Sequence, residues 1–136
     1  MIMNIAESFI DWTKKKIRYH IKKKKRDIYF YEGQVWWAAL GKNIGLEVDG
    51  KHEDFHRPVL IVKKYNADMC FVLPLTTQIK NPVVWYQVPV SVGDKKRVIN
   101  ITQGRTISSK RLLNKDGVVP IDEFKKIVEV YIKQFL

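Results

Sequence analysis

The sequence predicts a mainly β protein of the α+β class, in which a small antiparallel β-barrel carries a helix at each end of the chain. Short runs of β-branched and aromatic residues recur between about residues 33 and 107, with turn residues between them. Both ends of the chain instead show apolar residues at a helical period. With 136 residues, 46% of them hydrophobic, the chain suffices for one domain with a sizeable core.

The first helix is expected over residues 2–26, where no Pro or Gly interrupts the chain. Residues 1–26 hold nine Lys and Arg against two acids, a net +7 out of +11 for the whole chain. We interpret residues 1–30 as a basic helical extension and residues 31–136 as the barrel domain. Three roles stay open for the extension: a solvated helix packed by one narrow apolar stripe, a basic arm that holds RNA, and a membrane-surface helix, which is not favoured.

The strands are expected in order after this helix. Their predicted ranges are about 33–40, 58–65, 69–75, 83–90 and 96–103, the last extended by 104–107 with a bend at Gly104. Pro89 indicates that the fourth range is an edge strand or that the strand ends there. The segment 41–56 holds three glycines and is a long loop, and loops of this length are often functional.

The last third of the chain carries clear signals for helix starts and turns. Ser108 and Ser109 are N-cap candidates for a short helical turn, and Asp116-Gly117 predicts a turn. The final helix is expected over about 121–135, because its apolar residues form one regular face. Asp122 and Glu123 lie in its first turn, where the helix macrodipole favours acids.

The stretch from Arg57 to Ile79 carries the main functional prediction. It reads as two apolar strands joined by a tight turn, which brings the outer strand ends together. Arg57 stands at the start of the first strand, and Thr76 and Thr77 follow the second. A guanidinium and two hydroxyls should therefore meet at one end of the sheet, an arrangement that suits a phosphodiester. By spacing alone, Arg57 is equally suited to an ion pair with an acid of the loop, and Thr76 to a backbone hydrogen bond.

Composition narrows the class of protein. The strong excess of Lys and Arg favours a polyanionic partner, which is nucleic acid, an anionic membrane or an acidic protein. Cys70 is the single cysteine, so no intrachain disulfide forms, as fits a cytoplasmic protein. It lies in an apolar strand, which predicts a buried, inert thiol. No apolar run is long enough to span a membrane.

The segment His52-Glu53-Asp54-Phe55-His56 matches the zinc protease signature H-E-x-x-H. That chemistry needs both histidines on one face of a helix and a third ligand downstream. Gly50 and Pro58 leave too little room for such a helix, and no histidine follows His56. We predict no metal and no cofactor, and keep a zinc hydrolase as a minor alternative.

Four segments in register along the chain resemble the MazF/PemK family, the ribonuclease toxins of bacterial toxin–antitoxin pairs. They are E-G-Q-V-W-W-A-A-L-G, R-P-V-L-I-V, V-L-P-L-T-T-Q-I and Q-G-R-T-I-S-S-K-R-L, within residues 32–135. The resemblance implies a homodimeric SH3-like barrel that cleaves single-stranded RNA without a metal. It also implies a cognate antitoxin whose acidic, partly disordered tail occupies the RNA groove. The extension before residue 31 lies outside the pattern, so nothing transfers to it.

The resemblance also implies site residues. The family's arginine before Pro falls on Arg57, its threonine after the apolar strand on Thr76, and its loop glutamate on Glu47. His56 adjoins Arg57 and is the fourth catalytic candidate, for proton transfer. The candidates for RNA binding are Thr77, Gln78, Lys80, Trp85, Tyr86, Gln103 and Arg105. Trp85 and Tyr86 suit base stacking as well as a core or dimer contact.

We therefore expect an endoribonuclease toxin in which the 2′-hydroxyl of the RNA is the nucleophile. Arg57 would stabilise the phosphate, and Thr76 would donate a hydrogen bond to it. The alternative is a non-catalytic module on the same barrel, which binds nucleic acid or targets gyrase.

Overall fold

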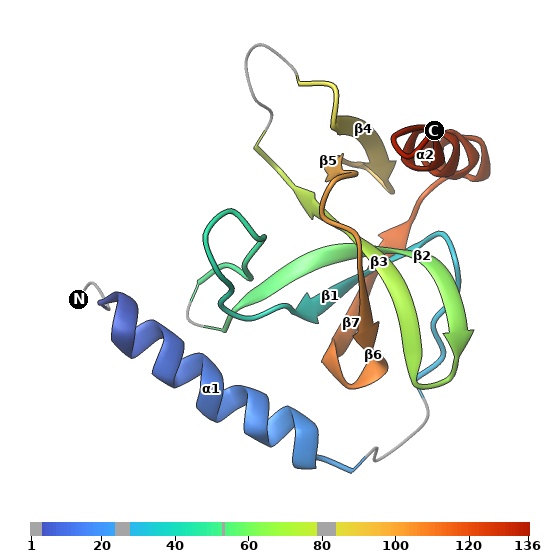
Figure 1. The fold of residues 1–136 in the computed structure, drawn as a ribbon. Helices are drawn as coiled ribbons and strands as arrows, with labels where there is room; N and C mark the ends of the chain where they lie inside the picture. The colour runs from blue at the N-terminus through green and yellow to red at the C-terminus, as the bar shows by residue number, and fades with distance from the viewer. Residues whose placement is uncertain (1–3, 24–27, 53, 79–83) are drawn as a thin grey trace.

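The structure is a computed structural model that describes residues 4–23, 28–52, 54–78 and 84–136. Helix α1 (Ile5–Ile21) and helix α2 (Ile121–Lys133) lie on opposite sides of the β-structure (Figure 1). The strands are β1 (Gln34–Ala39), β2 (His56–Asn66), β3 (Met69–Thr76), β4 (Gln87–Val92), β5 (Lys95–Asn100), β6 (Arg105–Ser108) and β7 (Leu112–Val118), with the short helix η1 (Ser109–Arg111) before β7.

The strands form one antiparallel sheet in the order β4-β5-β3-β2-β1-β7, with β6 paired to β3. The first half of β3 pairs with β6, and its last two residues, Leu75 and Thr76, pair with β5. This change of partner lets the sheet curl around its core. The path of described strands ends at β4 and β7, so hydrogen bonds among them do not close the barrel. The predicted class, mainly β with a helix at each end, is confirmed.

Two apolar clusters fill the curled sheet. Successive residues of a strand point to opposite faces, so β2 contributes Val59 and Ile61 to one cluster and Leu60 to the other. Ile127 of α2 is only 1% exposed and belongs to the second cluster. The apolar face expected for the C-terminal helix therefore covers the side of the sheet that Leu60 faces.

The structure corrects two of the predicted strands. The strand expected at 83–90 begins only at Gln87, so Trp85 and Tyr86 lie in a turn. The strand expected from 96 to 107 breaks into β5 and β6, which lets the chain cross from one end of β3 to the other. Gly104 lies in this break, where a Cβ atom would come within 2.4 Å of the Phe71 ring.

The predicted turn at Asp116-Gly117 is wrong, because both residues lie inside β7. Gly117 pairs with Val35 of β1, and the β1–β7 register shifts directly after this pair, between Val35 and Trp36. The Asp-Gly pair therefore marks an irregularity inside the strand. The helix start at Ser108 is confirmed, since its side chain accepts a hydrogen bond from Lys110 N at the start of η1.

Helix α1 packs against the barrel through Trp12, which is 6% exposed. The indole contacts Phe55 at a ring-centroid distance of 5.6 Å and lies against Gly41, where a Cβ atom would come within 2.0 Å of it. Lys110 Nζ donates to the His20 carbonyl at 2.8 Å, which holds the last turn of the helix. No described helix is long and apolar enough to cross a membrane.

Candidate active site

The outer ends of β2 and β3 meet as the hairpin pattern predicts. The antiparallel register pairs Val59 with Pro74, and extending it by two residues sets Arg57 opposite Thr76. A pocket of about 190 Å³ opens at this point. We call it the Arg57–Thr76 pocket, and its lining residues are Trp37, Lys51, His52, His56, Arg57, Pro58, Leu75, Thr76, Thr77 and Arg97.

The half-buried guanidinium of Arg57 is held by two backbone carbonyls. Its Nε donates to Asp49 O at 2.6 Å, and its Nη1 donates to Leu75 O at 3.2 Å. Burial lowers the pKa of Arg57, and the Asp49 carboxylate opposes this shift. No hydrogen bond to Nη2 is formed within the described part of the chain, so this nitrogen can donate to a ligand.

Thr76 ends β3 with its hydroxyl half-buried at the pocket. Its Oγ1 accepts a hydrogen bond from Gln78 N at 3.1 Å, so the backbone contact considered for this hydroxyl is present. An accepting hydroxyl still carries its own proton, which it can donate to a ligand. Thr77 and Gln78 follow, both exposed, and only Thr77 lines the pocket. Lys80 lies outside the described residues.

Two histidines line the same pocket because the chain turns tightly before β2. Lys51 and His56 form an antiparallel bridge, and His52 and Phe55 adopt φ values of 61° and 59° within the turn. Such left-handed conformations cost energy in residues other than glycine and often occur at functional sites. Burial lowers the pKa of His56, Asp54 opposes that shift, and Lys15 adds to it.

The helix that the zinc protease signature requires is not formed. His52 and Phe55 lie in a turn, and His56 begins β2. Glu53 lies outside the described residues. Within the described ranges, no three side chains of His, Cys, Asp or Glu gather in a way that would hold a metal ion.

Arg97 is a pocket residue that the sequence reasoning missed. It precedes Val98 on β5, and Val98 pairs with Thr76. Its Nη1 donates to Lys96 O at 3.1 Å, whereas its buried Nε has no hydrogen-bond partner in the described structure. A buried donor without an acceptor is uncommon and fits a site that receives an anion. The sequence signal was only a basic residue in a predicted strand, since the pairing of β5 with β3 is long-range.

Glu47, Gln103 and Arg105 gather in a second pocket, of about 290 Å³, on the other side of the 41–56 loop base. Gln103 fastens the loop, because its Nε2 donates to Leu46 O at 3.2 Å and its Oε1 accepts from Val48 N at 3.3 Å. Burial lowers the pKa of Arg105, and the carboxylate of Glu47 opposes this shift. The structure therefore places Glu47 beside Arg105 and not in the Arg57–Thr76 pocket.

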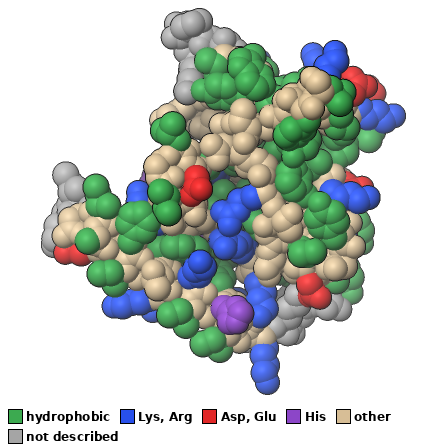
Figure 2. Space-filling model, in the orientation of Figure 1, with side chains coloured by type: hydrophobic (Ala, Val, Ile, Leu, Met, Phe, Trp, Pro, Cys, Tyr) green, Lys and Arg blue, Asp and Glu red, His purple; other side chains and the backbone are tan. Residues whose placement is uncertain are grey.

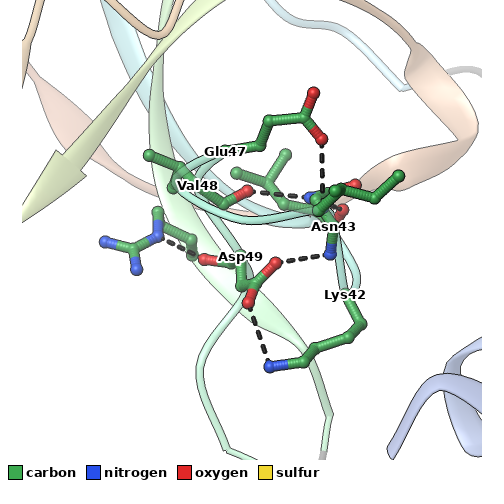
Figure 3. A network of polar contacts seen from close by, with 8 residues as sticks. Lys42, Asn43, Glu47, Val48 and Asp49 are labelled. Atoms are coloured by element: carbon green, nitrogen blue, oxygen red, sulfur yellow. Dashed lines mark hydrogen bonds and ion pairs between the residues drawn. The ribbon is translucent and has the colours of Figure 1, made fainter.

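The loop between β1 and β2 is ordered by its own polar groups (Figure 3). Asp49 accepts hydrogen bonds from Lys42 Nζ and Asn43 N, and Asn43 Nδ2 donates to Val48 O at 2.8 Å. Glu47 Oε1 accepts from Ile44 N at 3.0 Å. This network fixes the carbonyl of Asp49, which in turn positions Arg57.

The two aromatic candidates have different surroundings. Tyr86 is half-buried and packs against the second apolar cluster. Trp85 is 70% exposed and meets Tyr86 edge-on at 5.7 Å, and it lines neither pocket. Cys70 is fully buried, as predicted, and burial raises the pKa of its thiol to about 11, which disfavours the reactive thiolate.

Comparison with known protein families shows which family the chain belongs to. Residues 31–135 match the model of PemK-like, MazF-like toxins of type II toxin–antitoxin systems. The chain belongs to this family. The predicted resemblance to MazF/PemK toxins is thereby confirmed, and toxins of this family are known endoribonucleases. Helix α1 precedes the matched residues.

Solved MazF structures share the fold. MazF from Deinococcus radiodurans superposes with a TM-score of 0.67 at 18% identity, over 80% of this chain and 98% of that one. A mycobacterial endoribonuclease in complex with its cognate antitoxin gives 0.60 at 20% identity, over 79% and 95%. The Mycobacterium tuberculosis toxin MazF-mt6 gives 0.54 at 19% identity, over 75% and 95%. No curated protein sequence matches the chain.

Proposed function

We propose that this MazF-type toxin is a metal-independent endoribonuclease that cleaves single-stranded RNA in the cytoplasm. The observation that carries the proposal is the convergence of Arg57, Thr76 and His56 on one pocket at the outer ends of β2 and β3. Arg97 adds a buried donor without an acceptor among the described residues of that pocket. Such a set of donors suits a phosphate, and a phosphodiester of RNA carries its own nucleophile beside it.

In this reaction the 2′-oxygen of the RNA forms a bond to phosphorus, and the bond from phosphorus to the 5′-oxygen breaks. The products are a 2′,3′-cyclic phosphate and a 5′-hydroxyl. Arg57 and Thr76 donate hydrogen bonds to the non-bridging oxygens, where negative charge develops in the transition state. Removal of one such donor typically lowers the rate about 10²–10³-fold.

The reaction moves two protons. The 2′-hydroxyl loses one, and His56 is suited to accept it because burial lowers its pKa and so favours the neutral imidazole. The departing 5′-oxygen gains one, and His52 from the same pocket can supply it. Arg57 stays protonated in this scheme, since even a lowered guanidinium pKa makes it a poor base.

The second pocket and the exposed residues around β3 would bind the nucleotides next to the cleaved bond. Arg105, Glu47 and Gln103 offer a cation, an acceptor and an amide for base edges or phosphate. The exposed ring of Trp85 would stack on an unpaired base, and Thr77 and Gln78 would contact the backbone. We further propose a homodimer that is neutralised by an acidic, partly disordered antitoxin, in keeping with the net charge of +11.

The test is incubation of a long RNA with the purified protein in EDTA, followed by mapping of the cut ends. We expect cyclic phosphate and 5′-hydroxyl ends at short sequence motifs. Arg57→Ala should abolish cutting, but it also frees two backbone carbonyls, so its folding is checked by circular dichroism. Arg57→Lys is the matched control, because it keeps the charge and loses the planar fork.

Two results would contradict the proposal. RNA or DNA binding without any cut product would favour the non-catalytic or gyrase-targeting alternative. Cleavage that EDTA abolishes and zinc restores would favour a metal hydrolase.

A further inference from the structure

A hollow of about 340 Å³ lies between α1 and the turn that precedes β2. We call it the α1 groove, and its lining residues are Lys15, Arg18, Tyr19, Lys22, Asp54 and His56. His56 also lines the Arg57–Thr76 pocket, so the two hollows adjoin at this side chain. A polymer that contacts His56 in one hollow therefore lies next to the other.

The α1 groove carries an excess of positive charge. Asp54 is the one acid among the described residues that line it, and Lys15 Nζ lies 3.8 Å from the Asp54 carboxylate. Arg18 and Lys22 are exposed, and neither forms an ion pair with any described residue. They are four residues apart, so they lie on the same side of the helix. Lys and Arg side chains also gather in the hollow between α1 and the sheet on the face seen in Figure 2.

These charges are held in place by the docking of α1. Trp12 is buried against Phe55, two residues before Arg57, and Lys110 holds the carbonyl of His20. The positions of Arg18 and Lys22 relative to the Arg57–Thr76 pocket are therefore fixed by packing. Because α1 precedes the residues that match the family model, this groove is an addition to the shared fold.

We propose that the α1 groove binds two backbone phosphates of the same RNA strand, next to the phosphate that is cut, one on Arg18 and one on Lys22. This inference rests on the proposed ribonuclease function. A single strand passing His56 would present its next phosphates to these two cations, and exposed Arg and Lys bind phosphates in a way that salt weakens.

The geometry favours RNA over a membrane surface. Ile10, Ile17 and Ile21 form an exposed apolar stripe on α1, and a membrane-surface helix would insert such a stripe with its cations at the flanks. Arg18 and Lys22 instead line a concave groove beside the barrel.

The experiment compares a double variant, Arg18→Gln with Lys22→Gln, against a matched control, Lys14→Gln with Lys126→Gln. The control removes the same charge from exposed positions that line neither the groove nor the Arg57–Thr76 pocket. Substrates are oligoribonucleotides of increasing length around one cleavage site. For long substrates we expect the groove variant to raise KM about tenfold or more with kcat unchanged. The slope of log affinity against log salt should fall by about 1.4, since two phosphate contacts to a single strand are lost.

The substrate length gives a readout that a merely structural effect would not produce. The shortest oligonucleotide that is still cut should not reach the groove, so wild type and groove variant should cleave it equally. Equal behaviour of the groove variant and the control on long RNA would overturn the inference, as would an equal loss at every length. It would also be overturned if the variant lost binding to phosphatidylserine vesicles while its RNA kinetics stayed normal.

The experiment distinguishes a wrong inference about the α1 groove from a wrong proposal of ribonuclease function. If the wild type does not cut RNA, the proposed function fails. If the wild type cuts RNA but the groove variant behaves as the control does, only the present inference fails.

Discussion

Replacement of Trp12 by Ala should release α1 from the barrel while the barrel stays folded. Trp12 forms a small cluster with Ala39, Phe55 and Tyr19, separate from the two clusters that fill the sheet. The change therefore removes the anchor of the helix and leaves both barrel clusters intact.

The magnitude follows from the burial of the indole. A Trp side chain buries about 150–250 Å² when it packs, and Trp12 is 6% exposed, so at about 25 cal/mol per Å² it contributes up to about 4–6 kcal/mol to docking. The contacts that remain are weaker. The exposed Lys15–Asp54 pair contributes about 0–1 kcal/mol, and the approach of Lys42 to the Phe9 ring at 5.8 Å about 0.5–1 kcal/mol. A free helix of 17 residues is marginal in water, so α1 should also lose its helical structure.

The assay is amide hydrogen exchange over residues 5–21 and over β2 and β3. In Trp12→Ala the protection of α1 should fall by about a thousandfold, as expected for a loss of roughly 4 kcal/mol, while the strands stay protected. Ile17→Ala is the control, because Ile17 is 53% exposed on the same helix. The reasoning fails if α1 is as protected in Trp12→Ala as in Ile17→Ala, or if β2 and β3 lose protection together with α1.

Four further results are expected. Thr76→Val should lower kcat about 10²–10³-fold, because the donor to the phosphate is lost, and shift the melting temperature little, because the shape is kept and the lost hydrogen bond from Gln78 N is exposed; unchanged kcat would remove Thr76 from the mechanism. Arg97→Gln should lower kcat/KM without loss of thermal stability, since it removes a buried donor that has no partner among the described residues; destabilisation with normal activity would mark a structural role. Lys15→Gln should move the acid limb of the kcat/KM–pH profile to higher pH, because Lys15 lowers the pKa of His56 and the neutral imidazole is the active form; a shift to lower pH would contradict this role. Iodoacetamide should leave Cys70 unmodified in the native protein at neutral pH, because the thiol is buried with a pKa of about 11, and rapid alkylation seen by mass spectrometry would show that this strand opens.

The prediction errors share one cause. The segment 83–90 looked like a strand because Val and Trp favour strands, yet β4 begins at Gln87, where pairing with β5 becomes possible. Asp116-Gly117 looked like a turn, yet both residues lie inside β7, which pairs with β1 and shifts in register beside them. In both cases a distant partner strand decided what the local residues do.

The sequence by itself determined that the outer ends of β2 and β3 meet, because a tight turn makes the two strands antiparallel neighbours, and two register shifts along the pair then set Arg57 opposite Thr76. Only the tertiary structure decided that Arg97 joins them, since this depends on how β5 docks on the end of β3. It also set Glu47 beside Arg105 and laid α1 against the loop before β2. These placements come from packing between segments far apart in the chain, and no local pattern of residues encodes which distant surface a side chain will meet.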